Sequence, residues 1–366
     1  MINHFRLLII FLLTSGFLFD QKSDREPWYF LMNEEWKEVV FDESVFSFSG
    51  LDSLEDHIIR LLSNQNKEPL LFYCDLETAV CADGQCRLAR VKVYWNLLGN
   101  YVGYGIHPDD PLTKYDHVPF EHVDYEKLHK LLQDKNSLLS MKTMYDLVHQ
   151  VTENRSASDE NLTVDGISSA TKKEISRDVV KGGLYSCYTL WHLVNGNVTT
   201  QMKSYLDSIQ SEALITYFLH SHYLDYQMYA VKQLSADELK LHINQILNIF
   251  SKAQPVTQIF ILKKMTAEML AEKAVSESLF SQLEDISVSV RTELIGKINY
   301  AHQTGAEIVS YHLGTLTKSQ LKSYINFLTE HPEKLSGTIE ANLNQSVQSK
   351  KLTYGYLIEQ FLVSRN

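Results

Sequence analysis

The sequence predicts an α+β N-terminal domain with a small antiparallel sheet, followed by an all-α domain built as helical repeats or as a bundle. Residues 69–106 are predicted to be strands, because 69–81 form one strand-like run and apolar and polar side chains alternate from residue 86 onward. From about Thr199 onward the apolar residues recur with helical spacing instead. The 366 residues include only 7 Pro and 15 Gly, which favours long regular elements. We expect three parts, at residues 1–19, 20–197 and 198–366.

The first 19 residues have the composition of a secretory signal peptide. Arg6 supplies a positive charge, and an apolar stretch from Leu7 to Phe19 is interrupted only by small residues at 14–16. Thirteen residues are too few to cross a hydrocarbon core of about 30 Å as a helix, but they fit the apolar region of a signal peptide. We therefore expect a periplasmic or secreted protein. The alternatives are an uncleaved anchor, which would keep the protein membrane-associated, and a buried N-terminal helix.

One helix and three strands are expected before residue 107. Residues 53–65 have helical spacing, with their isoleucines and leucines on one face. A strand is expected within 69–81. A second follows from residue 86 to Trp95, and a Gly99-Asn100 turn should reverse the chain into a third strand at 101–106.

The chain between the last strand and residue 197 mixes loops and helices. Residues 107–117 are rich in Pro and Asp and predict a loop. Amphipathic helices are expected at 124–132 and 140–151. The polar residues 152–163 predict a loop or flexible tongue, and a turn followed by a helix is expected after residue 164.

The C-terminal part contains several segments with helical spacing, and we expect helices of about 12–20 residues joined by short turns. Many open with Ser, Thr or Pro, and Ser235 to Glu238 forms a capping-box pattern. Stacked helical hairpins and a compact bundle both fit this pattern. The predicted segments are 201–222, 235–253, 255–275, 279–301, 305–316, 317–332 and 352–366.

The chain has four cysteines, and the expected export would place them in an oxidising compartment, where disulfides form. Cys81 and Cys86 flank an Asp-Gly turn signal, so a disulfide across a hairpin is one expectation, and two free thiols are the other. The pairing of Cys74 and Cys187 cannot be derived from their spacing. The chain has no CxxC pair for zinc or redox chemistry.

Charge and motifs exclude several function classes. With 34 basic and 45 acidic residues the net charge is −11, and because no basic cluster stands out we expect no nucleic-acid partner. The motifs of serine hydrolases, dinucleotide-binding enzymes and zincins are absent from the sequence. His117, His122 and His129 follow no zinc-ligand spacing, so we expect no metal site and interpret them as surface or capping residues.

One segment carries residues suited to binding a phosphate group. Asp165-Gly166 favours a turn, and Ser168, Ser169 and Thr171 place three hydroxyl groups at a predicted helix start. Helix starts attract phosphate through unpaired N–H groups and the helix dipole. Two lysines follow at 172–173 and add positive charge.

This segment resembles the flavinylation motif of the FMN-binding domain family, whose members are electron carriers of Rnf and Nqr redox complexes. The family pattern is Asp, two variable residues, Ser or Thr, usually Gly, and then Ala-Thr. Asp165 matches the Asp, Ser168 the Ser or Thr, and Ala170 the Ala. Thr171 would be the attachment residue. Ser169 stands where the family usually has Gly, which tolerates backbone conformations that Ser resists.

The resemblance implies an exported flavoprotein for extracytoplasmic electron transfer. FMN would be attached covalently as a phosphoester to Thr171 by a separate flavin transferase, and a redox protein would be the partner of the C-terminal helices. The protein would position the flavin ring and tune its potential. Tyr185, Tyr188 and Trp191 follow at helical spacing and could form a wall of the ring site, although core packing explains the same spacing.

A different class of function fits the same residues. Thr171 to Glu174 also forms a capping-box pattern, so Thr171 or Ser168 could simply begin a helix. The protein would then be a non-catalytic envelope protein whose helical repeat domain binds a protein partner. Whether the protein is an enzyme is left open by the sequence, and no catalytic residues are assigned.

Overall fold

The computed structural model describes residues 28–30, 39–49, 56–80, 88–106, 110–114, 117–143, 177–349 and 352–365. The chain divides into two compact units, Met1–Ile209 and Gln210–Asn366. The described part of the first unit contains a sheet and helices, and the described part of the second contains helices without strands. The predicted fold class, α+β and then all-α, is therefore confirmed. The expected leader at 1–19 lies outside the described residues.

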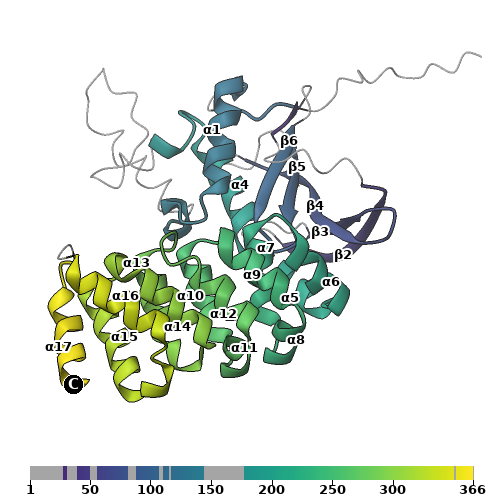
Figure 1. Cartoon of the computed structure of the whole chain (residues 1–366). Helices are drawn as coiled ribbons and strands as arrows, with labels where there is room; N and C mark the ends of the chain where they lie inside the picture. The colour runs from purple at the N-terminus through teal and green to yellow at the C-terminus, as the bar shows by residue number, and fades with distance from the viewer. Residues whose placement is uncertain are drawn as a thin grey trace, which may run out of the picture. The chain divides into compact units, whose positions relative to one another are not determined.

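One antiparallel sheet forms the centre of the first unit, in the strand order β1-β6-β5-β4-β3-β2 (Figure 1). The three strands expected within residues 69–106 are confirmed as β4, β5 and β6. Gly99 has a φ of 72° in the β5–β6 turn, a left-handed conformation that glycine adopts readily. The strands are β1 (Trp28–Tyr29), β2 (Phe41–Ser49), β3 (Asp56–Ser63), β4 (Pro69–Thr78), β5 (Ala89–Asn96) and β6 (Tyr101–Ile106).

The expected helix at 53–65 is wrong, because residues 56–63 form β3, which pairs with both β2 and β4. Ile59 and Leu61 are buried while Ile58 is exposed, which is the period of two that strands have. Adjacent pairs of apolar residues satisfy helical and strand spacing equally well. Pairing with two neighbouring strands, which is a tertiary interaction, decides between them.

Two helices and a short 3-10 helix complete the part of the first unit that packs on β6. They are α1 (His122–Gln133), η3 (Leu138–Met141) and α4 (Leu184–Asn195), with α1 on β6 and α4 on α1. Trp95 Nε1 in the sheet donates to the Val194 carbonyl of α4 at 2.9 Å. The Tyr104 hydroxyl donates to the Tyr125 carbonyl of α1 at 2.8 Å. These buried bonds join the sheet to its helices.

Helix α5 (Asn197–Ser208) also belongs to the first unit, so the division between the units at Ile209 lies one helix beyond the boundary expected at 197. The ring of Tyr205 on α5 lies 6.1 Å from that of Phe46 and 6.0 Å from that of Phe72, between centroids. These contacts pack α5 against the sheet, which explains why this helix groups with the α+β part.

Of the other expectations for the first unit, some are confirmed and others lie outside the described residues. The helix expected at 124–132 is confirmed within α1, where Glu121 and Asp124 form a capping box. Of the helix expected at 140–151, the first residues lie in η3 and 144–151 lie outside the described residues. The loop expected at 152–163, the turn after residue 164 and the predicted helix start at 168–171 also lie outside them. The next helix with described bounds is α4.

The second unit is a helical array. The capping box expected at Ser235 and Glu238 is confirmed at the start of α8. The helices are α6 (Glu212–His220), α7 (Leu224–Gln233), α8 (Ala236–Leu241), α9 (Ile243–Lys252), α10 (Pro255–Lys264), α11 (Ala267–Ala271), α12 (Lys273–Phe280), α13 (Val288–Ile295), α14 (Gln303–Tyr311), α15 (Lys318–Glu330), α16 (Gly337–Gln348) and α17 (Gly355–Arg365), with 3-10 turns η5 (Ile298–Tyr300), η6 (Leu313–Thr315) and η7 (Pro332–Lys334).

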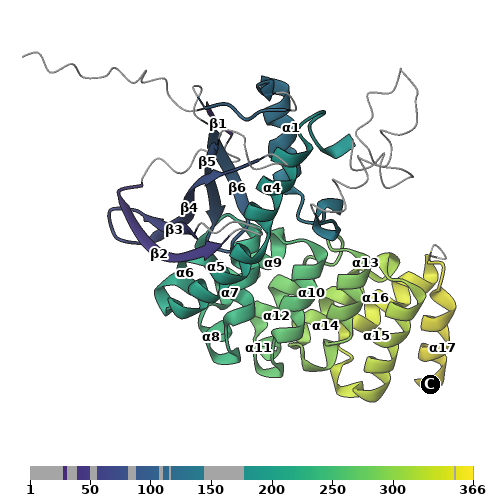
Figure 2. The ribbon, with the colours of Figure 1, turned by 180° about the vertical axis from the view of Figure 1, so that it is seen from behind.

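The later helices of this array stack in two rows (Figures 1 and 2). One row runs α10, α13, α15 and α17, and the other runs α12, α14 and α16, with each helix in contact with the next of its own row. Alternate helices of the chain therefore stack on each other. This arrangement extends along one direction instead of closing around one core, as in arrays of stacked helical pairs.

The helices of the second unit are shorter than the sequence predicts. The longest, α15, has 13 residues, and the expected helix at 255–275 is divided among α10, α11 and α12. Thr266 explains one division, because its side chain accepts the N–H of Met269 and begins α11. Within the described residues no helix is long and apolar enough to cross a membrane.

Helix α16 is absent from the sequence prediction. Only Ile339 and Leu343 are buried along its twelve residues, so its apolar pattern is weak. Ser336 is the signal that could have located it, because its side chain accepts the N–H of Ile339 as a helix cap does. Packing on α14 and α17 completes the stabilisation of a helix that is otherwise polar.

Two cations of the second unit bind the ends of neighbouring segments. Arg291 is buried, and its guanidinium donates to the carbonyl oxygens of Leu283, Ile286 and Thr315 at 2.7, 3.2 and 2.6 Å. Lys264 similarly donates to three carbonyl oxygens in and directly after the last turn of α7, at 2.6–2.9 Å. Positive side chains favourably bind these carbonyl groups, which the helices leave without partners.

Two of the four cysteines are described. Cys74 on β4 and Cys187 on α4 are thiols that form no disulfide and have no exposed surface. Burial raises the pKa of Cys74 to about 12, so its thiol stays protonated and unreactive. Cys81 and Cys86, for which a disulfide is expected, lie outside the described residues.

Candidate functional site

The candidate flavin-binding residues lie outside the described residues, as does the whole segment 144–176. The structure describes the chain up to Thr143 and again from Arg177, so the attachment of both ends to the first unit is known. Helix α4 contacts both ends. The candidate flavin-binding residues within this segment are Asp165, Ser168, Ser169, Ala170 and Thr171.

Three side chains of α4, those of Tyr188, Trp191 and His192, bind the chain that leads into segment 144–176. We call these three residues the α4 clasp. The Tyr188 hydroxyl donates to the carbonyl oxygen of Lys142 at 3.0 Å. Trp191 Nε1 donates to the carbonyl oxygen of Asp134 at 2.9 Å. His192 Nε2 lies 3.1 Å from a carbonyl oxygen of η3. Each of the three therefore binds a main-chain carbonyl group between the end of α1 and the start of segment 144–176.

The rings of the α4 clasp are part of the packing. Tyr188 and Trp191 are 5% and 4% exposed. The centroid of the His192 ring lies 4.3 Å from that of Tyr188 and 5.0 Å from that of Trp191. Tyr185, the third aromatic residue expected to wall a flavin ring, is half-buried. Tyr188 and Trp191 are thus packed in the interior, where Tyr188 binds the chain directly after η3 and Trp191 binds the end of α1, as the core-packing alternative for their spacing predicts.

The chain that returns from the segment is held at the start of α4. Val179 and Val180 are buried, and the backbone N–H of Val180 lies 3.4 Å from Sγ of Cys187. Gly183 is the N-cap of α4, and a β-carbon there would come within 2.8 Å of the Phe120 ring. Only glycine permits this close approach between the start of α4 and the loop before α1.

The loop at 112–120 packs beside the same helix start. It is hairpin-like, with backbone hydrogen bonds from Lys114 to Val118 and from Phe120 to Leu112 at 2.7 Å. The hydroxyl of Ser186 on α4 donates to the carbonyl oxygen of Thr113 at 3.0 Å. This loop overlaps the loop that the sequence predicts at 107–117. The loop thus packs beside the start of α4, a few residues after Arg177, where the described residues resume after segment 144–176.

A part-buried ion pair fixes this loop to α1. Lys114 Nζ lies 2.6 Å from a carboxylate oxygen of Asp124, and the two side chains are 22% and 12% exposed. The same carboxylate accepts the backbone N–H of Glu121 and so caps α1. In a part-buried ion pair, the free-energy cost of removing both charges from water opposes the attraction between them. We therefore assign this pair to the positioning of the loop and not to net stabilisation.

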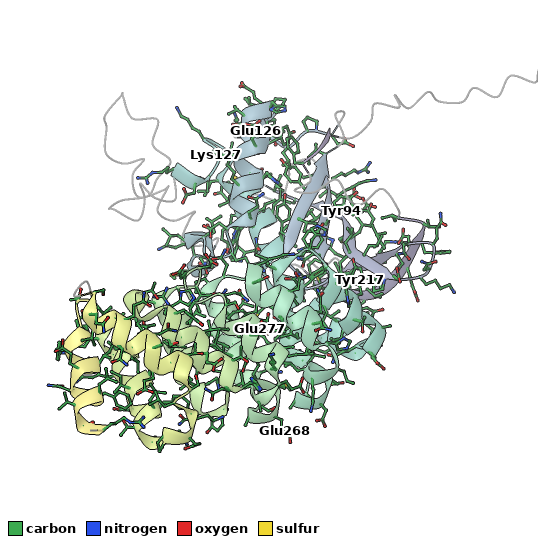
Figure 3. The ribbon with its side chains drawn as sticks, viewed as in Figure 1. Tyr94, Glu126, Lys127, Tyr217, Glu268 and Glu277 are labelled. Atoms are coloured by element: carbon green, nitrogen blue, oxygen red, sulfur yellow. The ribbon has the colours of Figure 1, made fainter. Side chains whose placement is uncertain are left out.

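The three histidines considered in the sequence do not come together. His122 is exposed and lies 3.5 Å from Glu126, which is labelled on α1 in Figure 3. His117 has a φ of 58° in the loop. His129 Nδ1 lies 2.8 Å from the Tyr101 hydroxyl. In the described parts of the chain no three His, Cys, Asp or Glu side chains are grouped so that they could hold a metal ion.

His129 belongs to a half-buried aromatic cluster between the sheet and α1. Its ring packs against those of Phe30, Tyr101 and Tyr104, with centroids 6.4, 5.5 and 6.1 Å away. Burial lowers the pKa of His129 and raises the pKa of Tyr101 well above its usual value. Both side chains are therefore neutral near pH 7, and their hydrogen bond fixes β6 to α1.

The other face of the sheet carries a pair of tyrosines. Tyr94, labelled in Figure 3, lies opposite Tyr73 on the neighbouring strand, with ring centroids 5.1 Å apart. The Nζ of Lys92 lies 6.0 Å from the Tyr73 ring. Such cross-strand pairs stabilise a sheet, so we assign them to the fold.

No family model, curated protein or solved structure matches this chain.

Proposed function

We propose that the protein is an exported carrier of covalently attached FMN that transfers electrons outside the cytoplasm. The observation that carries this proposal is the motif from Asp165 to Thr171, which follows a leader expected to direct export. Thr171 would form the phosphoester, and Asp165, Ser168, Ser169 and Ala170 would complete the site recognised by a flavin transferase. When bound, FMN would accept and release one or two electrons.

The attachment of segment 144–176 supports this proposal. Thr171 precedes Arg177 by six residues, which span at most about 20–22 Å when fully extended. Arg177 leads directly into the buried Val179 and Val180 beside α4. A flavin on Thr171 would therefore stay within reach of the first unit.

Intact-mass measurement tests the proposal. The full chain is coexpressed with an active flavin transferase, exported and purified, and we expect a mass increase of one FMN less one water together with yellow colour that survives denaturation. Thr171→Ala should abolish both. Thr163→Ala changes a threonine of the same segment outside the motif and should leave both unchanged.

Ser169→Gly provides a third variant. Because the family usually has Gly here, this change should increase the fraction of chains that carry FMN. Circular dichroism shows whether each variant folds. A colourless wild-type protein, or a Thr171→Ala variant that still gains the mass, contradicts the proposal.

A non-catalytic envelope protein is the second candidate. It is favoured by the second unit, whose neighbouring helices α10 and α13 expose Val256 and Val288 on their first turns, at 74% and 55%. Exposed apolar residues on stacked helices suit the binding of a protein partner. Colourless protein from cells with an active transferase would favour this candidate.

A further inference from the structure

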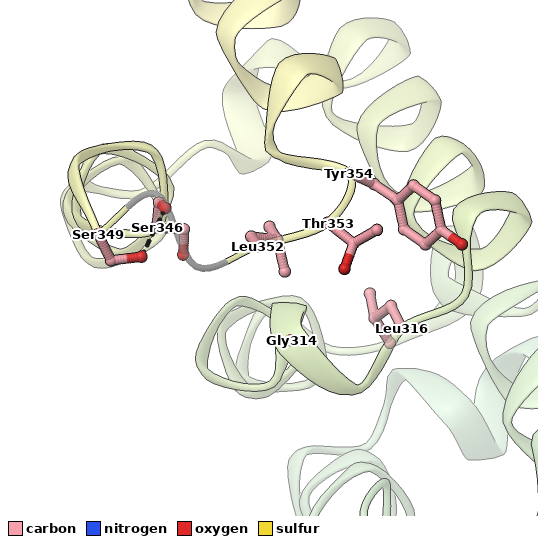
Figure 4. A pocket seen from close by; sticks show the side chains of 7 residues that line it. All are labelled: Gly314, Leu316, Ser346, Ser349, Leu352, Thr353 and Tyr354. Carbon is pink, nitrogen blue, oxygen red and sulfur yellow. Dashed lines mark hydrogen bonds between the residues drawn. The ribbon is translucent and has the colours of Figure 1, made fainter.

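We draw no further inference here: the strongest candidate, the hollow between Gly314 of η6, the end of α16 and the chain leading into α17 (Figure 4), carries none because the part of its wall between Ser349 and Leu352 lies outside the described residues and nothing in the structure shows what the hollow would hold.

Discussion

The hydroxyl of Tyr188 on α4 donates a hydrogen bond to the carbonyl oxygen of Lys142, 46 residues earlier in the chain, at 3.0 Å. This bond joins the helix to the last described turn before the segment that carries the proposed flavin site. Just beyond the other end of that segment, the backbone N–H of Val180 lies 3.4 Å from Sγ of Cys187, which is also on α4. One helix thus anchors both ends of the segment.

Tyr188→Phe should destabilise the first unit by about 1 kcal/mol. The change removes the donor and leaves the Lys142 carbonyl without this partner, while the ring stays in place. Urea unfolding measures the difference. Tyr205→Phe is the matched control: its ring contacts with Phe46 and Phe72 persist, and its hydroxyl has no hydrogen-bond partner among the described residues. Equal effects of the two changes would contradict a role for the Tyr188 bond.

Gly183→Ala should destabilise the first unit by about 1–3 kcal/mol, because the new methyl group would overlap the Phe120 ring at 2.8 Å. The measurement is again denaturant unfolding. A double-mutant cycle provides the control, since Phe120→Leu should reduce the effect of the added methyl group. Strictly additive effects of the two changes would exclude the close approach as the cause.

Arg291→Met should destabilise the second unit by about 3 kcal/mol or more. The change leaves three carbonyl groups without the buried guanidinium that binds them. Thermal unfolding followed by circular dichroism detects the loss. Lys263→Met serves as the control because Lys263 is exposed on α10 and, among the described residues, its ammonium group has no hydrogen-bond or ion-pair partner. A loss in Arg291→Met no larger than in this control would contradict the anchoring role.

The stability of the first unit should fall as the pH falls from about 7 toward 5. Burial lowers the folded-state pKa of both His129 and His192 below the usual value of about 6.5. In this range the unfolded chain binds more protons than the folded one, and stability therefore decreases with added acid. Unfolding measured across this range should show a shallower slope in His129→Gln. An unchanged slope in that variant would assign the effect to other groups.

Local patterns predicted much of the fold. The strand at residues 89–96 alternates without ambiguity, and a turn with glycine separates it from the strand at 101–106, so local signals locate both. The same rules mistook β3 for a helix, because its apolar pairs fit both periods and only its neighbours in the sheet select the strand. The polar helix α16 escaped prediction because packing on α14 and α17 replaces the missing apolar face.

The candidate site divides in the same way. The motif at residues 165–171 is a property of the sequence, because a modifying enzyme would recognise a short run of residues. The positions of Trp191 and His192 could not be derived in this way, since their partners lie 57 and 53 residues away along the chain. Their hydrogen bonds hold the backbone at the end of α1 and in η3.

By itself the sequence determined the order of an α+β part and a helical part, the acidic charge and the flavin-like motif, because each depends on residues close together in the chain. The tertiary structure decided the strand identity of β3, the assignment of α5 to the sheet unit and the clasp on α4. These features depend on contacts between distant residues, and the free energy of those contacts exceeds the small local preferences that a sequence pattern records.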